Sequence, residues 1–207
     1  MSVLAALAVA LIAWSVRGVS QKLLSVVLVG SGTALAVGDI FGLALYPWTD
    51  LLVLGFAVAG GVLVGRRLSP RPMPMLVLLT VLAVLDAIQI VALWSGAGPE
   101  VTGGAAPVSS FYGMLVLDTP WTHSGVGIFD VLVIAAIVEH ARRRGLPFAV
   151  GAAPGVLAFV AADVTFAALA PRDLPLIPFI LAGWLAMELA VRIAAVPAQS
   201  ETTPTAR

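Results

Sequence analysis

The sequence predicts an all-α, polytopic membrane protein with seven transmembrane helices, its N-terminus outside and its C-terminus inside. Of its 207 residues, 60% are hydrophobic and only 11% are charged, which is far from the balance of a soluble domain. The mean hydropathy is +1.07. Apolar runs that approach or exceed the roughly 20 residues needed to cross a bilayer as a helix recur along the whole chain.

The seven runs and the basic residues between them define the expected topology. The spans are expected at residues 2–17, 22–45, 51–66, 74–95, 123–141, 147–170 and 174–195. Clusters of Lys and Arg occupy alternate connections, which the positive-inside rule assigns to the cytoplasmic side. Residues 1–196 therefore form a single transmembrane domain, and the polar tail 197–207 is expected to be disordered and cytoplasmic.

Composition excludes several classes of function. The chain has no cysteine, so it has neither disulfides nor thiolate nucleophiles, and two histidines alone do not build a histidine metal centre. A net charge of zero argues against nucleic acid as a partner. No cofactor or metal is expected, and the sequence leaves homo-oligomerisation open. Ten of the eleven basic residues are arginine, which favours a GC-rich bacterium and its plasma membrane as the location.

Two aspartates interrupt the fourth and fifth spans, where a charge needs a reason. An aspartate near mid-membrane costs about 2.5–3.5 kcal/mol on insertion scales. Asp86 lies eight residues before Trp94, and Asp130 lies eight residues after Thr122, so both are expected about 12 Å below the outer boundary. Two antiparallel helices would bring these acids level with each other. Gln89, one turn from Asp86, is placed to orient it.

A pair of carboxyls in a low-dielectric site suits hydrolysis of a peptide bond. Because the two groups cannot easily both ionise, they share a proton, and one can act as base while the other acts as acid. The alternative is two protonated acids that merely hydrogen-bond across helices.

Three stretches then resemble, in the same order, the signatures of the presenilin and signal peptide peptidase family of intramembrane aspartyl proteases. They are VLAVLDAIQIVAL around Asp86, GVGIFDVLVIAAI around Asp130, and LPLIPFILAG, which opens the last span. The resemblance, to a divergent and shortened member with two fewer spans, implies that Asp86 and Asp130 are the catalytic dyad. It also implies that Pro175, Leu176 and Ile177 stand at the family's Pro-Ala-Leu element and help to bind substrate.

The resemblance is incomplete at both catalytic motifs. Leu85 stands where the family has tyrosine, and Phe129 stands where its second Gly-x-Gly-Asp glycine would be, although Gly127 lies close by. By resemblance, Gly127 and Phe129 line the substrate site, and the substrates are single-pass transmembrane segments with a cytoplasmic N-terminus. The apolar stretch SSFYGMLVLD in the outer loop is too short to span, and a strand, a re-entrant piece or an interfacial anchor are all possible for it.

Two other classes of function remain open at this point. Asp39 and Asp163 fall at a similar predicted depth, and four acids at one level are typical of a small proton- or cation-coupled transporter or channel. The bulky Phe129 equally suits an inactive relative that binds helices without cutting them. Near the inner boundary, Glu139 and His140 are expected to form a solvated interfacial cluster with the arginines that follow, and Glu188 is either an interhelical hydrogen-bond partner or part of a gate.

Overall fold

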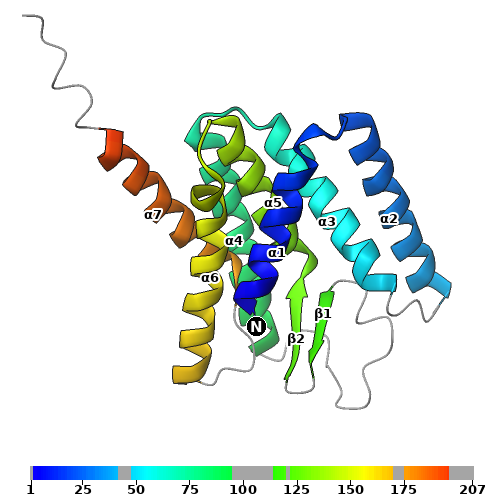
Figure 1. Cartoon of the computed structure of the whole chain (residues 1–207). Coiled ribbons are helices and arrows are strands. Elements are labelled where there is room, and N and C mark those ends of the chain that lie inside the picture. Colours follow the sequence, from blue (N-terminus) through cyan, green and yellow to red (C-terminus); the bar gives the residue numbers. More distant parts are fainter. Residues whose placement is uncertain (1, 42–47, 95–113, 120–121, 170–174, 196–207) are drawn as a thin grey trace, which may run out of the picture.

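The structure, a computed structural model, describes residues 2–41, 48–94, 114–119, 122–169 and 175–195 (Figure 1). This part of the chain is almost entirely helical, with one short β-hairpin. The helices are α1 (Ser2–Ser15), η1 (Val16–Gly18), α2 (Gln21–Phe41), α3 (Trp48–Arg67), α4 (Pro72–Trp94), α5 (Ile128–Arg143), α6 (Phe148–Leu169) and α7 (Ile177–Ala195). The hairpin consists of β1 (Met114–Thr119) and β2 (Thr122–Gly127).

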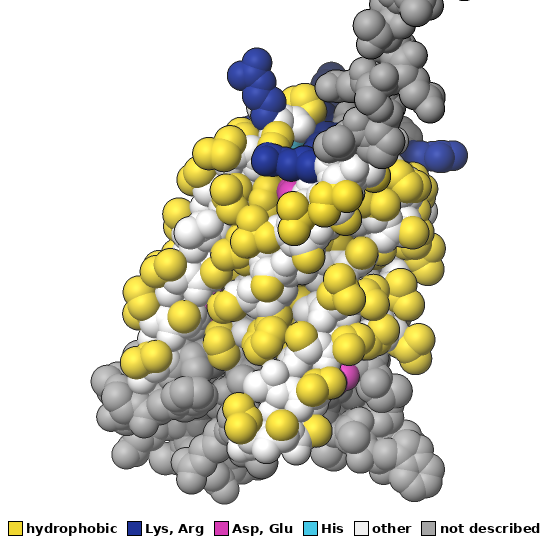
Figure 2. All heavy atoms as spheres, turned by 90° about the vertical axis from the view of Figure 1, so that its left-hand side faces the viewer, with side chains coloured by type: hydrophobic (Ala, Val, Ile, Leu, Met, Phe, Trp, Pro, Cys, Tyr) yellow, Lys and Arg dark blue, Asp and Glu magenta, His cyan; other side chains and the backbone are white. Residues whose placement is uncertain are grey.

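Four helical segments are long and apolar enough to cross a membrane by length and composition. They are Gln21–Gly38, Trp48–Arg67, Phe148–Leu169 and Ile177–Ala194. Shorter apolar segments occur at Val3–Gly18 and Pro72–Ile88. Large hydrophobic side chains cover the outward faces of these helices, and the Lys and Arg side chains visible in Figure 2 lie at one end of the molecule. The protein is therefore a multi-pass membrane protein.

Helix α5 is the centre around which the other helices pack (Figure 1). It is buried from Val131 to Ala141 except at Leu132, which is half-buried. It packs against α3, α6 and α1, while α2 lies outside α3 and α7 packs against α6 and α4. Gly145, with φ of 75°, ends the helix: its N–H donates to Arg142, and the next N–H, of Leu146, donates to Ala141, which satisfies the last carbonyl groups.

The hairpin corrects the prediction for the fifth span. That helix was expected to begin at residue 123, but Thr122–Gly127 is a strand and α5 begins at Ile128. β2 pairs antiparallel with β1, with Met114 opposite Gly127 and Thr119 opposite Thr122. Glycine and β-branched residues disfavour a helix here, and β1 offers backbone hydrogen-bond partners. Thr122–Gly127 therefore forms a strand, although its apolar pattern predicted a helix. Of the alternatives left open for the outer loop, the described part of SSFYGMLVLD is thus a strand.

Glycines let α3 lie directly against α5. A Cβ atom on Gly61 would overlap the carbonyl oxygen of Leu132 and lie 2.7 Å from Cβ of Ala135. One turn on, a Cβ on Gly65 would lie 2.7 Å from the carbonyl oxygen of Ala136. Neither backbone oxygen can move away alone, so any side chain at these positions forces the helices apart.

Gly61→Ala is therefore expected to lower the free energy of unfolding by about 2–3 kcal/mol, as overpacking a tight interface does. Thermal unfolding of the purified protein in a mild detergent measures the effect. Gly30→Ala is the matched control, because a Cβ there meets nothing within 4 Å, and it should leave the midpoint unchanged or slightly higher. Equal midpoints for the two variants would contradict the close α3–α5 contact.

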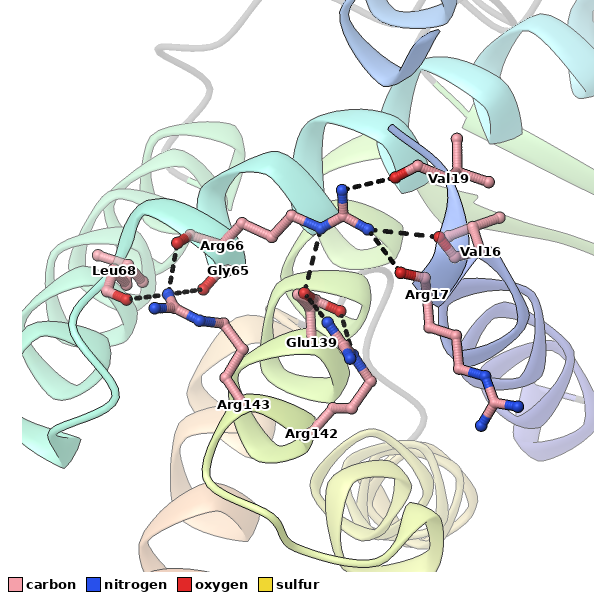
Figure 3. Close-up of polar contacts among 9 residues, drawn as sticks. All are labelled: Val16, Arg17, Val19, Gly65, Arg66, Leu68, Glu139, Arg142 and Arg143. Atoms are coloured by element: carbon pink, nitrogen blue, oxygen red, sulfur yellow. Dashed lines mark hydrogen bonds and ion pairs between the residues drawn. The ribbon is translucent and has the colours of Figure 1, made fainter. Parts of the chain in front are cut away.

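At the basic end of the molecule, Glu139 of α5 is a fully buried acceptor for two arginines (Figure 3). Its Oε1 accepts from Arg66 Nε at 3.2 Å and from Arg142 Nη2 at 2.6 Å, and its Oε2 accepts from Arg142 Nε at 2.8 Å. The prediction of a solvated cluster was wrong for Glu139 and for His140, which are 0% and 1% exposed. Packing of α3 across the end of α5 buries them, and sequence periodicity does not report that crossing.

Arg66 and Arg143 also donate hydrogen bonds to carbonyl groups at the ends of neighbouring helices. Arg66 of α3 donates to the carbonyl oxygens of Val19 (2.8 Å) and Arg17 (3.2 Å), just past the end of α1. Arg143 donates to those of Gly65 (3.2 Å), Arg66 and Leu68 (2.6 Å), at the end of α3 (Figure 3). Since helix C-termini carry unpaired carbonyls and a partial negative charge, these contacts tie α1, α3 and α5 together at one end.

Candidate carboxylate site at two helix N-termini

Asp86 is held at the beginning of α7, although it belongs to α4. Its Oδ2 accepts a hydrogen bond from the backbone N–H of Ile177 at 3.0 Å, and the backbone of Leu176 interacts with the same carboxyl. Ile177 is the first residue of α7 and follows Pro175 by two positions. The first N–H groups of a helix have no partner within it and carry a partial positive charge. The carboxylate of Asp86 therefore caps a neighbouring helix rather than its own.

Asp130 is held at the beginning of α5 by a similar device. It is the third residue of that helix, and its Oδ2 accepts from the backbone N–H of Gly127, the N-cap residue, at 3.1 Å. This is the return half of a capping box, in which the third residue of a helix reaches back to the N-cap. A Cβ at Gly127 would lie 2.9 Å from Oδ2, so glycine leaves room for the carboxylate.

Asp86 is thus bonded at the beginning of α7 and Asp130 at the beginning of α5. The carboxyl groups interact electrostatically with each other, and both side chains are half-buried. Each of the two interacting acids thus lies at a helix N-terminus, Asp86 at that of α7 and Asp130 at that of α5. Because each carboxylate is next to a helix N-terminus, one negative charge is stabilised there, while a second adjacent charge is opposed by the first.

The other predicted site residues take different positions. Pro175 and Leu176 are half-buried and precede the residue that binds Asp86. Phe129, next to Asp130, is 62% exposed, so its ring is directed away from the core. Leu85, next to Asp86, is 57% exposed. Both carboxyls are thus preceded by a bulky apolar side chain on an accessible surface.

The remaining candidates lie on α2, α4 and α6. Asp163 is exposed on α6, and Asp39 lies on α2, which packs against α3; the side chains of Asp39 and Gln89 are outside the described residues. Figure 1 shows α2 and α6 on different sides of α5. Among the described residues, no group of three or more His, Asp or Glu side chains could hold a metal ion.

Sequence reasoning missed the two capping contacts. The spacing of Gly127 and Asp130, three residues apart at a helix start, is a capping-box signal and could have been read from the chain. The bond between Asp86 and Ile177 spans 91 positions, and no local pattern signals it. Comparisons with protein families, with curated proteins and with solved structures find no match for this chain.

Proposed function

We propose that this protein is an intramembrane aspartyl protease that cleaves transmembrane segments with Asp86 and Asp130. The observation that carries the proposal is that these two acids interact electrostatically, each bonded at the N-terminus of a helix, α5 or α7. Two purely structural carboxyls gain nothing from lying within electrostatic reach of each other, since like charges repel. Two adjacent acids that are half-buried, and therefore accessible, instead suit chemistry that transfers protons.

The proposed mechanism uses one proton shared by the pair. The ionised aspartate takes a proton from a water molecule, which attacks the carbonyl carbon of the scissile peptide bond. The protonated aspartate donates its proton to the carbonyl oxygen, forming a tetrahedral gem-diol. As this intermediate collapses, the C–N bond breaks and the proton gained from water passes to the leaving amine. The aspartate that protonated the carbonyl oxygen takes a proton back from one hydroxyl, which leaves a carboxylic acid and restores the pair with one proton. The helix N-termini stabilise the negative charge that remains on the pair.

The proposed topology has seven spans, with the N-terminus outside and the C-terminus inside the plasma membrane of a bacterium. It is supported by the gathering of arginines at one end, where Arg66 reaches the end of α1 and Arg143 reaches the end of α3. Helix α5 has 16 residues and covers only about 24 Å, so β2 would complete this crossing. The carboxyl pair then lies toward the outer side.

The proposed substrates are single-pass membrane segments with a cytoplasmic N-terminus. A helix must unwind before a protease can cleave it, and its freed backbone groups then need partners within the membrane. The β1–β2 hairpin leads directly into the helix that carries Asp130, and its edge could bind an unwound substrate by strand addition.

The test is incubation of the purified protein, in detergent and in liposomes, with a panel of single-span peptides, followed by mass spectrometry of the products. Cleavage within the apolar segment, insensitive to chelators, is the expected result. Proton-coupled cation flux in the liposomes without cleavage would instead favour a transporter that uses Asp39, Asp86, Asp130 and Asp163. Binding of the peptides without either activity would identify an inactive relative.

Phe129 provides a test of whether this side chain lines the substrate site. Phe129 precedes Asp130 in the chain and is 62% exposed, and we propose that its ring limits the size of the residues that fit next to the reacting carboxyl. Phe129→Gly is expected to raise kcat/KM about 10-fold for peptides with bulky residues at the cleavage site, because it removes this obstruction. Phe129→Leu, which keeps an apolar side chain of similar reach, is the control. If both variants cleave bulky and small peptides with the wild-type ratio, Phe129 does not line the substrate site.

A further inference from the structure

The helices that begin at the carboxylate site are joined again at their other ends. Arg144, which follows α5, donates from Nη1 to Oε1 of Glu188 on α7 and from Nη2 to Oε2 at 3.1 Å. The pair is enclosed: the side chains are 16% and 7% exposed. A two-pronged arginine–carboxylate pair of this kind defines the orientation of its partners as well as their distance.

This ion pair links two helices that otherwise contact each other little, although both pack against α6. Helix α7 packs against α6 and α4, whereas α5 packs against α3, α6 and α1. Ile177 binds Asp86, so the start of α7 and this carboxyl move together. Asp130 is bonded within α5 itself. The position of α7 relative to α5 therefore determines how far apart the two carboxyls lie.

We infer that Arg144 and Glu188 are positioning residues that set the separation of Asp86 and Asp130 from the far end of the two helices. Glu188 lies eleven residues after Ile177, about 16 Å along α7, and Arg144 lies fourteen residues after Asp130, about 21 Å along α5. A tilt of about 5° at the ion pair would displace the start of α7 by roughly 1.5 Å over this length. In an active site, an error of that size costs about 100-fold in rate.

Two buried polar side chains near the ion pair, one on α5 and one on α7, could bind the Glu188 carboxylate in place of Arg144. His140 and Trp184 are each 1% exposed. Neither imidazole nitrogen of His140 has a hydrogen-bond partner among the described residues, and the same holds for the indole N–H of Trp184. His140 precedes Arg144 by one turn, Trp184 precedes Glu188 by one turn, and His140 interacts electrostatically with both members of the ion pair. Without Arg144, the Glu188 carboxylate can turn toward these nitrogens. Loss of the Arg144 side chain is therefore expected to move α7 to a new position, and not only to remove one contact.

The position of α7 can be measured without any assay of activity. Because the chain has no cysteine, spin labels can be attached at Ala182→Cys on α7 and Leu51→Cys on α3, both exposed positions. Pulsed electron paramagnetic resonance of the full chain in nanodiscs then gives the distance between the labels. Glu188→Gln and Arg144→Gln are expected to shift this distance by about 0.8 Å or to broaden its distribution, because Ala182 lies six residues, about 9 Å, from the ion pair. An unchanged distribution in both variants would overturn the inference.

Two further variants separate positioning from general stability. The exchange Arg144→Glu with Glu188→Arg should restore the distance, since it rebuilds the pair with reversed charges. Arg142→Gln removes a comparable arginine–glutamate contact that does not involve α7, and it should leave the distance unchanged. A wild-type distance in the exchange variant but a shifted one in the single variants is the expected pattern. A shift in Arg142→Gln equal to that in Arg144→Gln would mean a merely structural role.

The catalytic part of this inference rests on the proposed function and has its own readout. Glu188→Gln is expected to lower kcat about 10- to 100-fold with KM changed less than twofold, and the charge exchange should recover most of kcat. A shifted distance with unchanged kcat would overturn the link between the ion pair and the carboxyls. If the wild-type protein cleaves no peptide, the protease proposal fails, and the distance measurement still decides whether the ion pair positions α7.

Discussion

Asp86→Asn and Asp130→Asn are each expected to abolish cleavage, lowering kcat by about 1,000-fold or more, because general acid–base catalysis by each group supplies that much. Asparagine keeps the size of the side chain and can still accept the N–H of Ile177 or Gly127 through its amide oxygen. It cannot take or give up a proton. The loss should therefore appear in kcat for single-span peptides, while thermal unfolding shows that each variant remains folded.

Asp163→Asn is the control for this pair, because it makes the same chemical change on an exposed part of α6. It should keep wild-type cleavage. Full activity in either Asp86→Asn or Asp130→Asn would reject the dyad. A loss of cation flux in these three variants and in Asp39→Asn, with no cleavage by the wild type, would establish the transporter instead.

Glu139→Ala is expected to have the largest effect on stability, lowering the free energy of unfolding by about 3 kcal/mol. The buried carboxylate is the common partner of Arg66 and Arg142, and its removal leaves their charges unpaired at a helix interface. The value is at the lower end for a broken buried pair because the Arg142 side chain is 30% exposed and keeps some water. Unfolding in mixed detergent micelles, followed by circular dichroism, measures the change.

Arg67→Gln is the matched control for Glu139→Ala. It removes a charge next to Arg66 at the same end of α3, but from an exposed side chain. Its expected effect is within about 0.5 kcal/mol, as for most surface substitutions. A loss of stability in Glu139→Ala no larger than in Arg67→Gln would show that the buried network does not hold α3 against α5.

Hydrophobic patterning was enough to locate the helices because the membrane requires long apolar segments. The predicted span at 51–66 corresponds to α3 (Trp48–Arg67), and the span at 147–170 corresponds to α6 (Phe148–Leu169). Patterning failed at the start of α5, where β2 continues the same apolar run in an extended conformation. Hydropathy measures transfer into lipid, and it does not distinguish a helix from a strand that finds a partner.

The acidic residues within the spans could be found from sequence, because placing a carboxyl in an apolar membrane segment costs free energy. The residues that they contact could not be found in this way. Asp86 and Asp130 stood out on this ground, and so did Asp163, which the structure places on an exposed face of α6. Which acids meet depends on how α4, α5 and α7 cross, and the residues that decide those crossings are far apart in the chain. The burial of Glu139 and His140 could not be predicted either, because it also depends on how distant helices cross.

By itself, the sequence determined that this is a helical membrane protein, where most of its helices lie, and which acids need an explanation, since each of these follows from the cost of moving a local segment into lipid. Only the tertiary structure decided that Asp86 of α4 caps α7 and that Arg144, just after α5, binds Glu188 of α7. These contacts join residues far apart in the chain, and they depend on close approaches such as Gly61 against Leu132, which arise only when whole helices pack.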